Sequence, residues 1–252
     1  MQVRVTRPQG QAAAWVARRA ERGMAASALP LIDIAEPADP SAVDRAWRSL
    51  PACRLVIFVS PNAAERFFAH RPGERAWPDD VLAAAVGPGT AQVLRECGVP
   101  APAVVEPSAD AAQFDSESLW LQLQHRDWSG AKVLIVRGDG GRAWLADTLV
   151  QHGAQVQFVS AYRRLPPRFD DEQQHRLEAA IAQPAQHLWF FSSSEAIDHL
   201  AAARPAAAWQ GACALATHPR IAERARQQGF GSVHTCRPSL DAVVACIQSI
   251  AS

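Results

Sequence analysis

The chain has 252 residues, which is enough for one large domain or two small ones. Hydrophobic residues make up 48% and charged residues 20%, as is typical of a soluble globular protein. The 25 basic side chains equal the 25 acidic ones, which argues against a nucleic-acid-binding protein and against an anionic-membrane surface. No apolar run reaches the roughly 18–20 residues that span a bilayer.

The N-terminus enters a strand-like pattern at once, without the basic-then-apolar segment of a secretory signal. The five cysteines are odd in number, and none forms a Cys-x-x-Cys pair. We therefore expect reduced thiols and a cytoplasmic protein. A monomer is predicted, with a weak dimer as the open alternative.

Strand and helix patterns alternate along the first half. Strands are expected at residues 2–6, 27–34, 54–59, 81–86 and 104–105. Helices are expected at 11–22, with Gly23 as the C-cap, and at 41–50, 63–70, 91–96 and 116–124. The fully apolar segment 54–59 is typical of a buried parallel strand.

The second half has the same alternation. Strands are expected at residues 132–136, 156–160, 187–191, 212–216 and 233–235. Helices are expected at 143–152, 170–182, 195–202, 220–228 and 240–250. Alternating strands and helices predict an α/β protein with parallel sheets.

Six landmarks recur at a nearly constant offset, which indicates an internal duplication. The matched pairs, 130 to 132 residues apart, are Arg7 and Arg137, Gly23 and Gly153, Ser60 and Ser192, Pro88 and Pro219, Gly98 and Gly229, and Pro107 and Pro238. Two similar α/β units follow from this repeat. Whether they coincide with the sequence halves stays open, because the Pro-flanked segments 31–36 and 161–166 are natural crossing points between domains.

A glycine-rich turn, residues 137–142, connects a strand to a helix. Gly138, Gly140 and Ala143 match the loose dinucleotide pattern Gly-x-Gly-x-x-Ala. That pattern needs an acidic residue near Ser160, and none is there, so NAD or FAD is disfavoured. A tight turn that requires glycine is one alternative. We favour an anion site at the helix N-terminus, supported by Arg137 and Arg142.

Small hydroxyl residues occupy further strand-to-helix turns, at Ser60-Pro61-Asn62, Gly87-Pro88-Gly89-Thr90 and Ser192-Ser193-Ser194. Helix capping or a bare turn explains them as well as carboxylate binding by hydroxyl and N–H groups does. A serine nucleophile is not expected, because no Gly-x-Ser-x-Gly elbow is present.

The eight histidines do not cluster, and no spacing suggests a metal site. For His218, in a strand-to-helix turn, a surface position is favoured over a ligand contact. Tyr162 is the only tyrosine and lies at a proposed crossing point. It is either a half-exposed linker aromatic or a phenol that projects into an inter-domain cleft and donates a hydrogen bond or proton.

The ordered motifs resemble those of the uroporphyrinogen-III synthase family over nearly the whole chain. They are Val5-Thr6-Arg7-Pro8, Phe58 to Ala63, Ala85 to Ala91, Val133 to Arg142 with Leu145, Ala161 to Arg164, and Phe190 to Glu195. The resemblance implies two α/β domains, each a parallel sheet flanked by helices, joined by a two-stranded linker. One domain would comprise residues 1–33 and 166–252 and the other residues 36–160, with linker strands near 31–36 and 161–166.

The resemblance also implies the chemistry. Family members close linear hydroxymethylbilane to uroporphyrinogen III, with loss of water and inversion of ring D through a spiro intermediate, and they need no cofactor. Accordingly, neither a cofactor nor a metal is expected here. A small-molecule polycarboxylate substrate suits a site of helix N-termini, hydroxyls and a few arginines.

The site residues follow from the matched motifs. Tyr162 matches the linker tyrosine and is expected to assist departure of the substrate hydroxyl. Where many members have Gly-Pro-x-Thr-Ala in the second half, this chain has His218-Pro219-Arg220-Ile221-Ala222, and Arg220 is our hypothesis for the missing contact. The predicted substrate-binding residues are Thr6, Arg7, Ser60, Asn62, Gly87, Thr90, Arg137, Gly138, Gly140, Gly141, Arg142, Ser192, Ser193, Ser194 and Arg220.

Two other classes of protein remain as alternatives. Duplicated α/β lobes also suit a two-domain small-anion binding protein without catalysis. A nucleotide-dependent enzyme is disfavoured by the missing ribose-binding acid.

Overall fold

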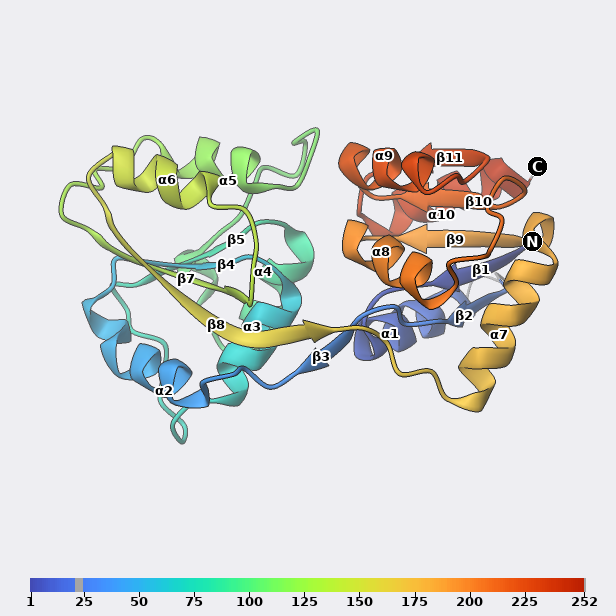
Figure 1. Ribbon diagram of the computed structural model, residues 1–252. Coiled ribbons are helices and arrows are strands. Elements are labelled where there is room, and N and C mark those ends of the chain that lie inside the picture. Colours follow the sequence, from blue (N-terminus) through green and yellow to red (C-terminus); the bar gives the residue numbers. More distant parts are fainter. Residues whose placement is uncertain (21–24, 252) are drawn as a thin grey trace. The chain divides into compact units, whose positions relative to one another are not determined.

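The computed structural model describes residues 1–20 and 25–251 and divides the chain into two compact units. Unit 1 comprises Met1–Asp33 and Leu165–Ser252, and unit 2 comprises Ile34–Arg164. In each unit the strands at the centre of the sheet pair in parallel, and helices lie on both faces (Figure 1). The predicted α/β fold class is therefore confirmed.

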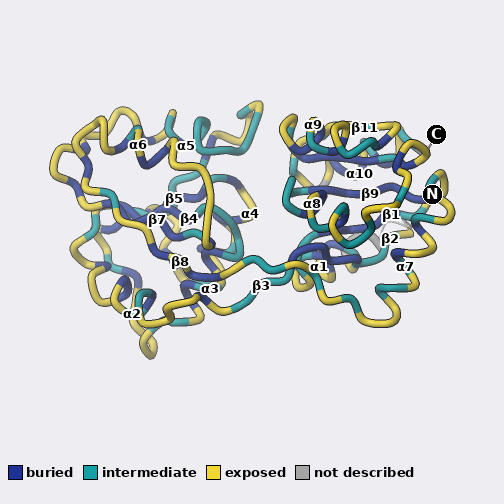
Figure 2. The backbone as a smooth tube through the Cα atoms, viewed as in Figure 1, coloured by how far each residue is buried: buried dark blue, intermediate teal, exposed yellow. Residues whose placement is uncertain are grey.

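Unit 2 is built on a six-stranded sheet in the order β3-β8-β7-β4-β5-β6. Its strands are β3 (Asp33–Ala35), β4 (Leu55–Phe58), β5 (Leu82–Ala85), β6 (Val104–Val105), β7 (Lys132–Gly138) and β8 (Gln155–Leu165). The central strand β4 is fully buried because helices cover both faces of the sheet (Figure 2).

Five helices cover the sheet of unit 2. α2 (Pro40–Ser49), α3 (Pro61–Ala69) and α4 (Pro88–Glu96) pack on one face, and α5 (Ser116–Leu123) and α6 (Trp144–Gln151) on the other. The first core contains an aromatic cluster in which Trp47 stacks on Phe67 with ring centroids 4.7 Å apart. The indole N–H of Trp47 donates to the Phe67 carbonyl at 2.8 Å, so this buried polar group is satisfied.

Unit 1 is built on a five-stranded sheet in the order β11-β10-β9-β1-β2. Its strands are β1 (Gln2–Val5), β2 (Ala26–Ala28), β9 (His187–Phe191), β10 (Cys213–Ala216) and β11 (Ser232–Thr235). Its helices are α1 (Gln9–Ala20), α7 (Asp171–Ala182), α8 (Ser194–Ala203), α9 (Pro219–Gln227) and α10 (Leu240–Ala251). Short 3₁₀ turns lie at Leu50–Ala52, Ala101–Ala103 and Pro184–Gln186.

The helices of unit 1 also divide between two faces. Trp15 of α1 and Val243 of α10 pack against Val3 and Leu188 in one core. The connections from β9 to β10 and from β10 to β11 run along the sheet in the opposite direction to the connection from β1 to β2. Because such connections are right-handed, α8 and α9 lie on the face opposite to α1. α7 lies on that face as well, and its Arg176 donates to the Ala28 carbonyl of β2.

The two units share one strand order. The order β2-β1-β9-β10-β11 in unit 1 corresponds to β8-β7-β4-β5-β6 in unit 2. Gly98 and Gly229, which follow the equivalent helices α4 and α9, have φ angles of +87° and +94°, a region that favours glycine. This agrees with the predicted repeat. Gly23 lies outside the described residues, so its expected capping role is not described.

Two predicted strands need correction. Segment 27–34 is not one strand: β2 ends at Ala28 in unit 1, and β3 starts at Asp33 at the edge of the unit 2 sheet. Pro30 lies between them and lacks the N–H that a continuous ladder needs. The predicted strand 156–160 instead extends from Gln155 to Leu165 and ends before Pro166.

His187, the first residue of β9, is only 5% exposed. Burial lowers the pKa of its imidazole, and repulsion from Arg4 and the N-terminal amine adds to the effect, whereas the carbonyls of Gln2 and Ala179 oppose it. The unfolded chain therefore binds this proton more readily than the folded chain does.

We expect the free energy of unfolding to fall as the pH drops below 6.5, the ordinary pKa of histidine. His187→Gln should flatten this dependence, and the exposed variant His125→Gln should retain it. Urea unfolding across a pH series measures the effect. Parallel curves for wild type and His187→Gln would contradict the prediction.

Candidate active site

In unit 2, three predicted site segments lie at one edge of the sheet. The turns at Ser60–Asn62, Gly87–Thr90 and Gly138–Arg142 follow β4, β5 and β7, which are adjacent and parallel. The carboxyl ends of parallel strands share one edge, the usual ligand-binding edge of open α/β sheets. The structure therefore brings these residues to the same side of unit 2.

Tyr162 and Ser60 are in direct contact at this edge. The phenol oxygen of Tyr162 lies 3.1 Å from Ser60 Oγ. Ser60 is the N-cap of α3, and its Oγ accepts from the backbone N–H of Ala63 at 3.1 Å. One serine thus fixes both the start of the helix and the position of the phenol.

The expectation that Tyr162 is a half-exposed linker aromatic was wrong for this structure, whereas its role towards a substrate stays a prediction. Its side chain is fully buried, in the core formed with α2, α3 and α4. A β-bulge causes this, because Arg137 pairs with Ser160 whereas the next residue, Gly138, pairs with Tyr162. The extra residue puts Ala161 and Tyr162 in the same core, although neighbours in a regular strand alternate.

Gly138 makes room for the phenol. A Cβ atom at this position would lie 3.0 Å from Tyr162 Cζ and 3.4 Å from its hydroxyl oxygen. Carbon atoms in contact normally stay about 3.5–4.0 Å apart. Of the turn glycines, Gly138 is therefore required by the close approach of Tyr162.

Arg164 was missed as a site residue. Its guanidinium donates to the Tyr162 oxygen at 3.0 Å, and its backbone N–H lies 3.4 Å from an Asp139 carboxylate oxygen. The signal was present in the sequence, because residues two apart on a strand lie on the same face. A cation beside the phenol oxygen stabilises negative charge that develops there.

The other residues of the glycine-rich turn play different parts. The Arg137 guanidinium carbon lies 4.0 Å from the centroid of the Phe158 ring, and its Nε is buried with no hydrogen-bond partner among the described residues. Arg142, predicted as an anion support, instead pairs with Glu117 through both guanidinium nitrogens. Gly140 and Gly141 are exposed.

The turn after β5 is tightly packed. Gly87 is the N-cap residue of α4, and a Cβ there would lie 3.2 Å from the Phe114 Cβ. Thr90 is only 3% exposed, and its backbone N–H donates to the Gly87 carbonyl at 3.1 Å. Asn62 is half-buried in the first turn of α3.

In unit 1, the equivalent edge holds the remaining predicted residues. Thr6 and Arg7 follow β1, residues 192–194 follow β9, and Arg220 follows β10, three adjacent parallel strands. Thr6 Oγ1 donates to the Phe190 carbonyl at 2.8 Å, which ties β1 to β9.

Arg7 resembles its repeat partner Arg137 in its surroundings. Its guanidinium carbon lies 5.6 Å from the Phe190 ring centroid, and its Nε is buried without a partner among the described residues. Burial lowers the pKa of Arg7. Each unit therefore presents one aromatic-backed arginine at the carboxyl end of an equivalent strand, β1 or β7, at a position where an anion would be stabilised.

The first turn of α9 departs from its counterpart in unit 2. His218 replaces Gly87 as the N-cap residue, and its Nδ1 accepts from the Arg220 backbone N–H at 3.1 Å. His218 is half-buried and Arg220 is exposed. His218 is thus a helix cap, whereas the sequence pattern suggested only a surface position or a ligand contact for this residue.

The serine caps of α3 and α8 provide a matched test. Ser60, the N-cap residue of α3, makes a side-chain cap, whereas Ser193, the N-cap residue of α8, makes none. We expect Ser60→Ala to lower the free energy of unfolding by about 1–2 kcal/mol, because it removes both the cap and the Tyr162 contact. Ser193→Ala should stay within about 0.5 kcal/mol of wild type. Equal losses in chemical denaturation would contradict this difference.

Comparison with known proteins agrees with this geometry. A family model described as uroporphyrinogen-III synthase HemD matches residues 13–245. The chain belongs to the uroporphyrinogen-III synthase family. A relative named uroporphyrinogen-III synthase from Salmonella typhimurium is 27% identical over 257 residues, covering 92% of this chain and 94% of the relative.

Further relatives of the uroporphyrinogen-III synthase family support the assignment. The protein of that name from Escherichia coli is 28% identical over 174 residues, covering 68% of each chain. The fold is similar to crystal structures of uroporphyrinogen III synthases from Helicobacter pylori, with a TM-score of 0.61, 15% identity and 99% of both chains covered, and from Thermus thermophilus, with a TM-score of 0.59, 18% identity and 99% and 98% covered. Within the described part of the chain, no helix is long and apolar enough to cross a membrane.

Proposed function

We propose that this chain cyclises hydroxymethylbilane to uroporphyrinogen III, with loss of water and inversion of ring D. Membership of the uroporphyrinogen-III synthase family supports the reaction. The observation that carries the site assignment is the contact among Tyr162, Ser60 and Arg164 at the carboxyl edge of unit 2.

Little acid–base machinery is needed for this reaction. The substrate expels its own hydroxyl to form an azafulvene cation, and the hydroxyl leaves as water once it has gained a proton. Tyr162 is proposed to donate the hydrogen bond that assists this departure. Arg164, which donates to the phenol oxygen, holds the phenol in place and stabilises the charge left on it.

The more demanding step is control of ring D. The attack that leads to the spiro intermediate must precede the simple closure that gives isomer I. Holding the chain of rings in one geometry achieves this, so the enzyme acts mainly by positioning. The proposed contacts for the substrate carboxylates are the strand-end turns, with Arg7 and Arg137 as the cations that have an unpartnered Nε among the described residues.

The same proposal extends to Arg220 and Arg142. Arg220 is exposed in the first turn of α9 and takes the place of the threonine turn of other members. Arg142 is paired with Glu117, so a substrate carboxylate would have to compete with that ion pair. We therefore expect Arg142 to contribute less to substrate affinity than Arg7 or Arg137.

The decisive measurement is the isomer ratio of the product. Hydroxymethylbilane is supplied by a coupled enzyme, and the products are oxidised and separated as uroporphyrins I and III. We expect isomer III to dominate with this protein and isomer I to dominate in the enzyme-free control. Isomer I alone in both reactions would leave a binding protein without catalysis as the better assignment.

We further propose a cytoplasmic monomer. All five cysteines are free thiols, which supports a reducing compartment. Light scattering on the purified chain should give the mass of one chain, and a dimer mass would overturn this part of the proposal.

A further inference from the structure

Arg4 is a buried cation inside unit 1. It lies in the middle of β1 and is only 3% exposed. One guanidinium nitrogen donates to Ser27 Oγ, but Nε is buried and has no hydrogen-bond partner among the described residues. The described ion pairs join no carboxylate to it.

The residues that share a sheet face with Arg4 add donors and no carboxylate. In the parallel ladder Arg4 is opposite Trp189, and Gln2 is opposite His187, so these side chains share one face of the sheet. Trp189 Nε1 and His187 Nδ1 are also buried without a partner among the described residues. Burial lowers the pKa of Arg4, and the guanidinium of Arg176 on α7, which is itself paired with Glu172, adds to the effect.

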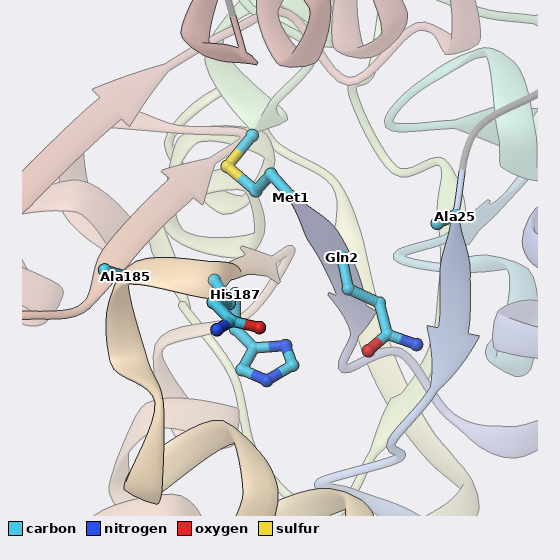
Figure 3. Close-up of a pocket in the computed structure, with 6 residues that line it drawn as sticks. Met1, Gln2, Ala25, Ala185 and His187 are labelled. Atoms are coloured by element: carbon cyan, nitrogen blue, oxygen red, sulfur yellow. The ribbon is translucent and has the colours of Figure 1, made fainter.

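A cavity of about 470 Å³ lies at the amino ends of β1 and β9. It is lined by Met1, Gln2, Ala25, Ala185, Gln186 and His187, and Figure 3 shows the Gln2 and His187 side chains there. This edge of the unit 1 sheet is opposite to the edge of Thr6 and Arg7. The cavity is therefore distinct from the turns assigned to the substrate.

A buried cation without a counter-charge is unfavourable, and a buried polar atom without a hydrogen bond, such as Arg4 Nε, adds to the cost. An acceptor with negative charge would satisfy the donors and neutralise Arg4, whereas water would satisfy only the donors. We propose that unit 1 binds a small oxyanion, a phosphate or a carboxylate, beside Arg4, with access through the cavity lined by Gln2 and His187.

The test compares the full-length wild type with Arg4→Met and with Arg7→Met after exhaustive dialysis into chloride buffer. Thermal unfolding is followed in chloride, inorganic phosphate and acetate at matched ionic strength. For wild type, we expect phosphate or acetate at about ten times its Kd to raise Tm by about 5 °C. Arg4→Met should lose the shift, and Arg7→Met should retain it.

The second readout is the stability of Arg4→Met relative to wild type in chloride buffer. There Arg4→Met should be at least as stable as wild type, because it removes an unpaired buried charge. Loss of the shift in Arg7→Met but not in Arg4→Met would place the anion at the strand-end turns and overturn the proposal. A wild type that responds to neither anion would also overturn it, leaving buried water as the acceptor. A response to only one of the two identifies the class of oxyanion.

Discussion

Tyr162→Phe is expected to lower turnover about 10²-fold while the chain still folds. The variant loses the hydroxyl that contacts Ser60 and Arg164 but keeps the ring packed beside Gly138. Loss of a positioned proton donor typically costs 10²–10⁴-fold in rate. Removal of one hydrogen-bonding group should cost only about 1 kcal/mol in the free energy of unfolding. The initial rate of uroporphyrinogen III formation and urea denaturation measure the two effects.

Arg164→Met serves as the companion variant. Because Arg164 contacts the phenol and is not assigned to the substrate, it should lower kcat about tenfold and change KM little. Unchanged turnover in Tyr162→Phe would remove the phenol from the reaction. A large loss of stability in that variant would instead mean that the hydroxyl serves mainly to stabilise unit 2.

Gly138→Ala is expected to be far more damaging than the same change at Gly140 of the glycine-rich turn. The new Cβ would lie 3.0 Å from Tyr162 Cζ, so the ring or the bulged strand must move. Overpacking of this kind costs about 1–3 kcal/mol. Displacement of the phenol by about 1 Å should lower turnover about 10²-fold as well.

Gly140→Ala is the matched control for stability. A Cβ at Gly140 has no atom within 4 Å, so its free energy of unfolding should stay within about 0.5 kcal/mol of wild type. Urea unfolding of both variants decides the comparison. Equal stability of Gly138→Ala and Gly140→Ala would mean that Tyr162 moves aside without cost.

Apolar periodicity, together with the Gly and Pro residues that end each element, was sufficient to predict strands in both sheets. Runs such as Leu55–Phe58 and His187–Phe191 are fully apolar or nearly so and occur between helical patterns, and the structure buries both. The offset of the repeat landmarks predicted two similar α/β units, and the structure adds that five strands of each sheet share one order. Strand patterns and repeat landmarks of this kind can be inferred without knowledge of contacts between distant residues.

The details of the site depended on long-range packing, which no local pattern contains. The bulge at Arg137 and Gly138 turns Tyr162 into a core, against the alternation that a regular strand would give. Arg142 pairs with Glu117, 25 residues away in sequence. Neither result could be predicted from the turn alone, because each depends on which helix packs over it.

The split of unit 1 between the two ends of the chain has a kinetic consequence. Ile34–Arg164 is continuous, so unit 2 can form while the ribosome is still adding later residues. β1, in contrast, can pair with β2 early but gains its second partner, β9, only after residue 187 has been made. Closing so long a loop slows folding. Until then Val3 and Val5 lack their contacts with Leu188 and Phe190, so unit 1 is expected to complete its core later than unit 2.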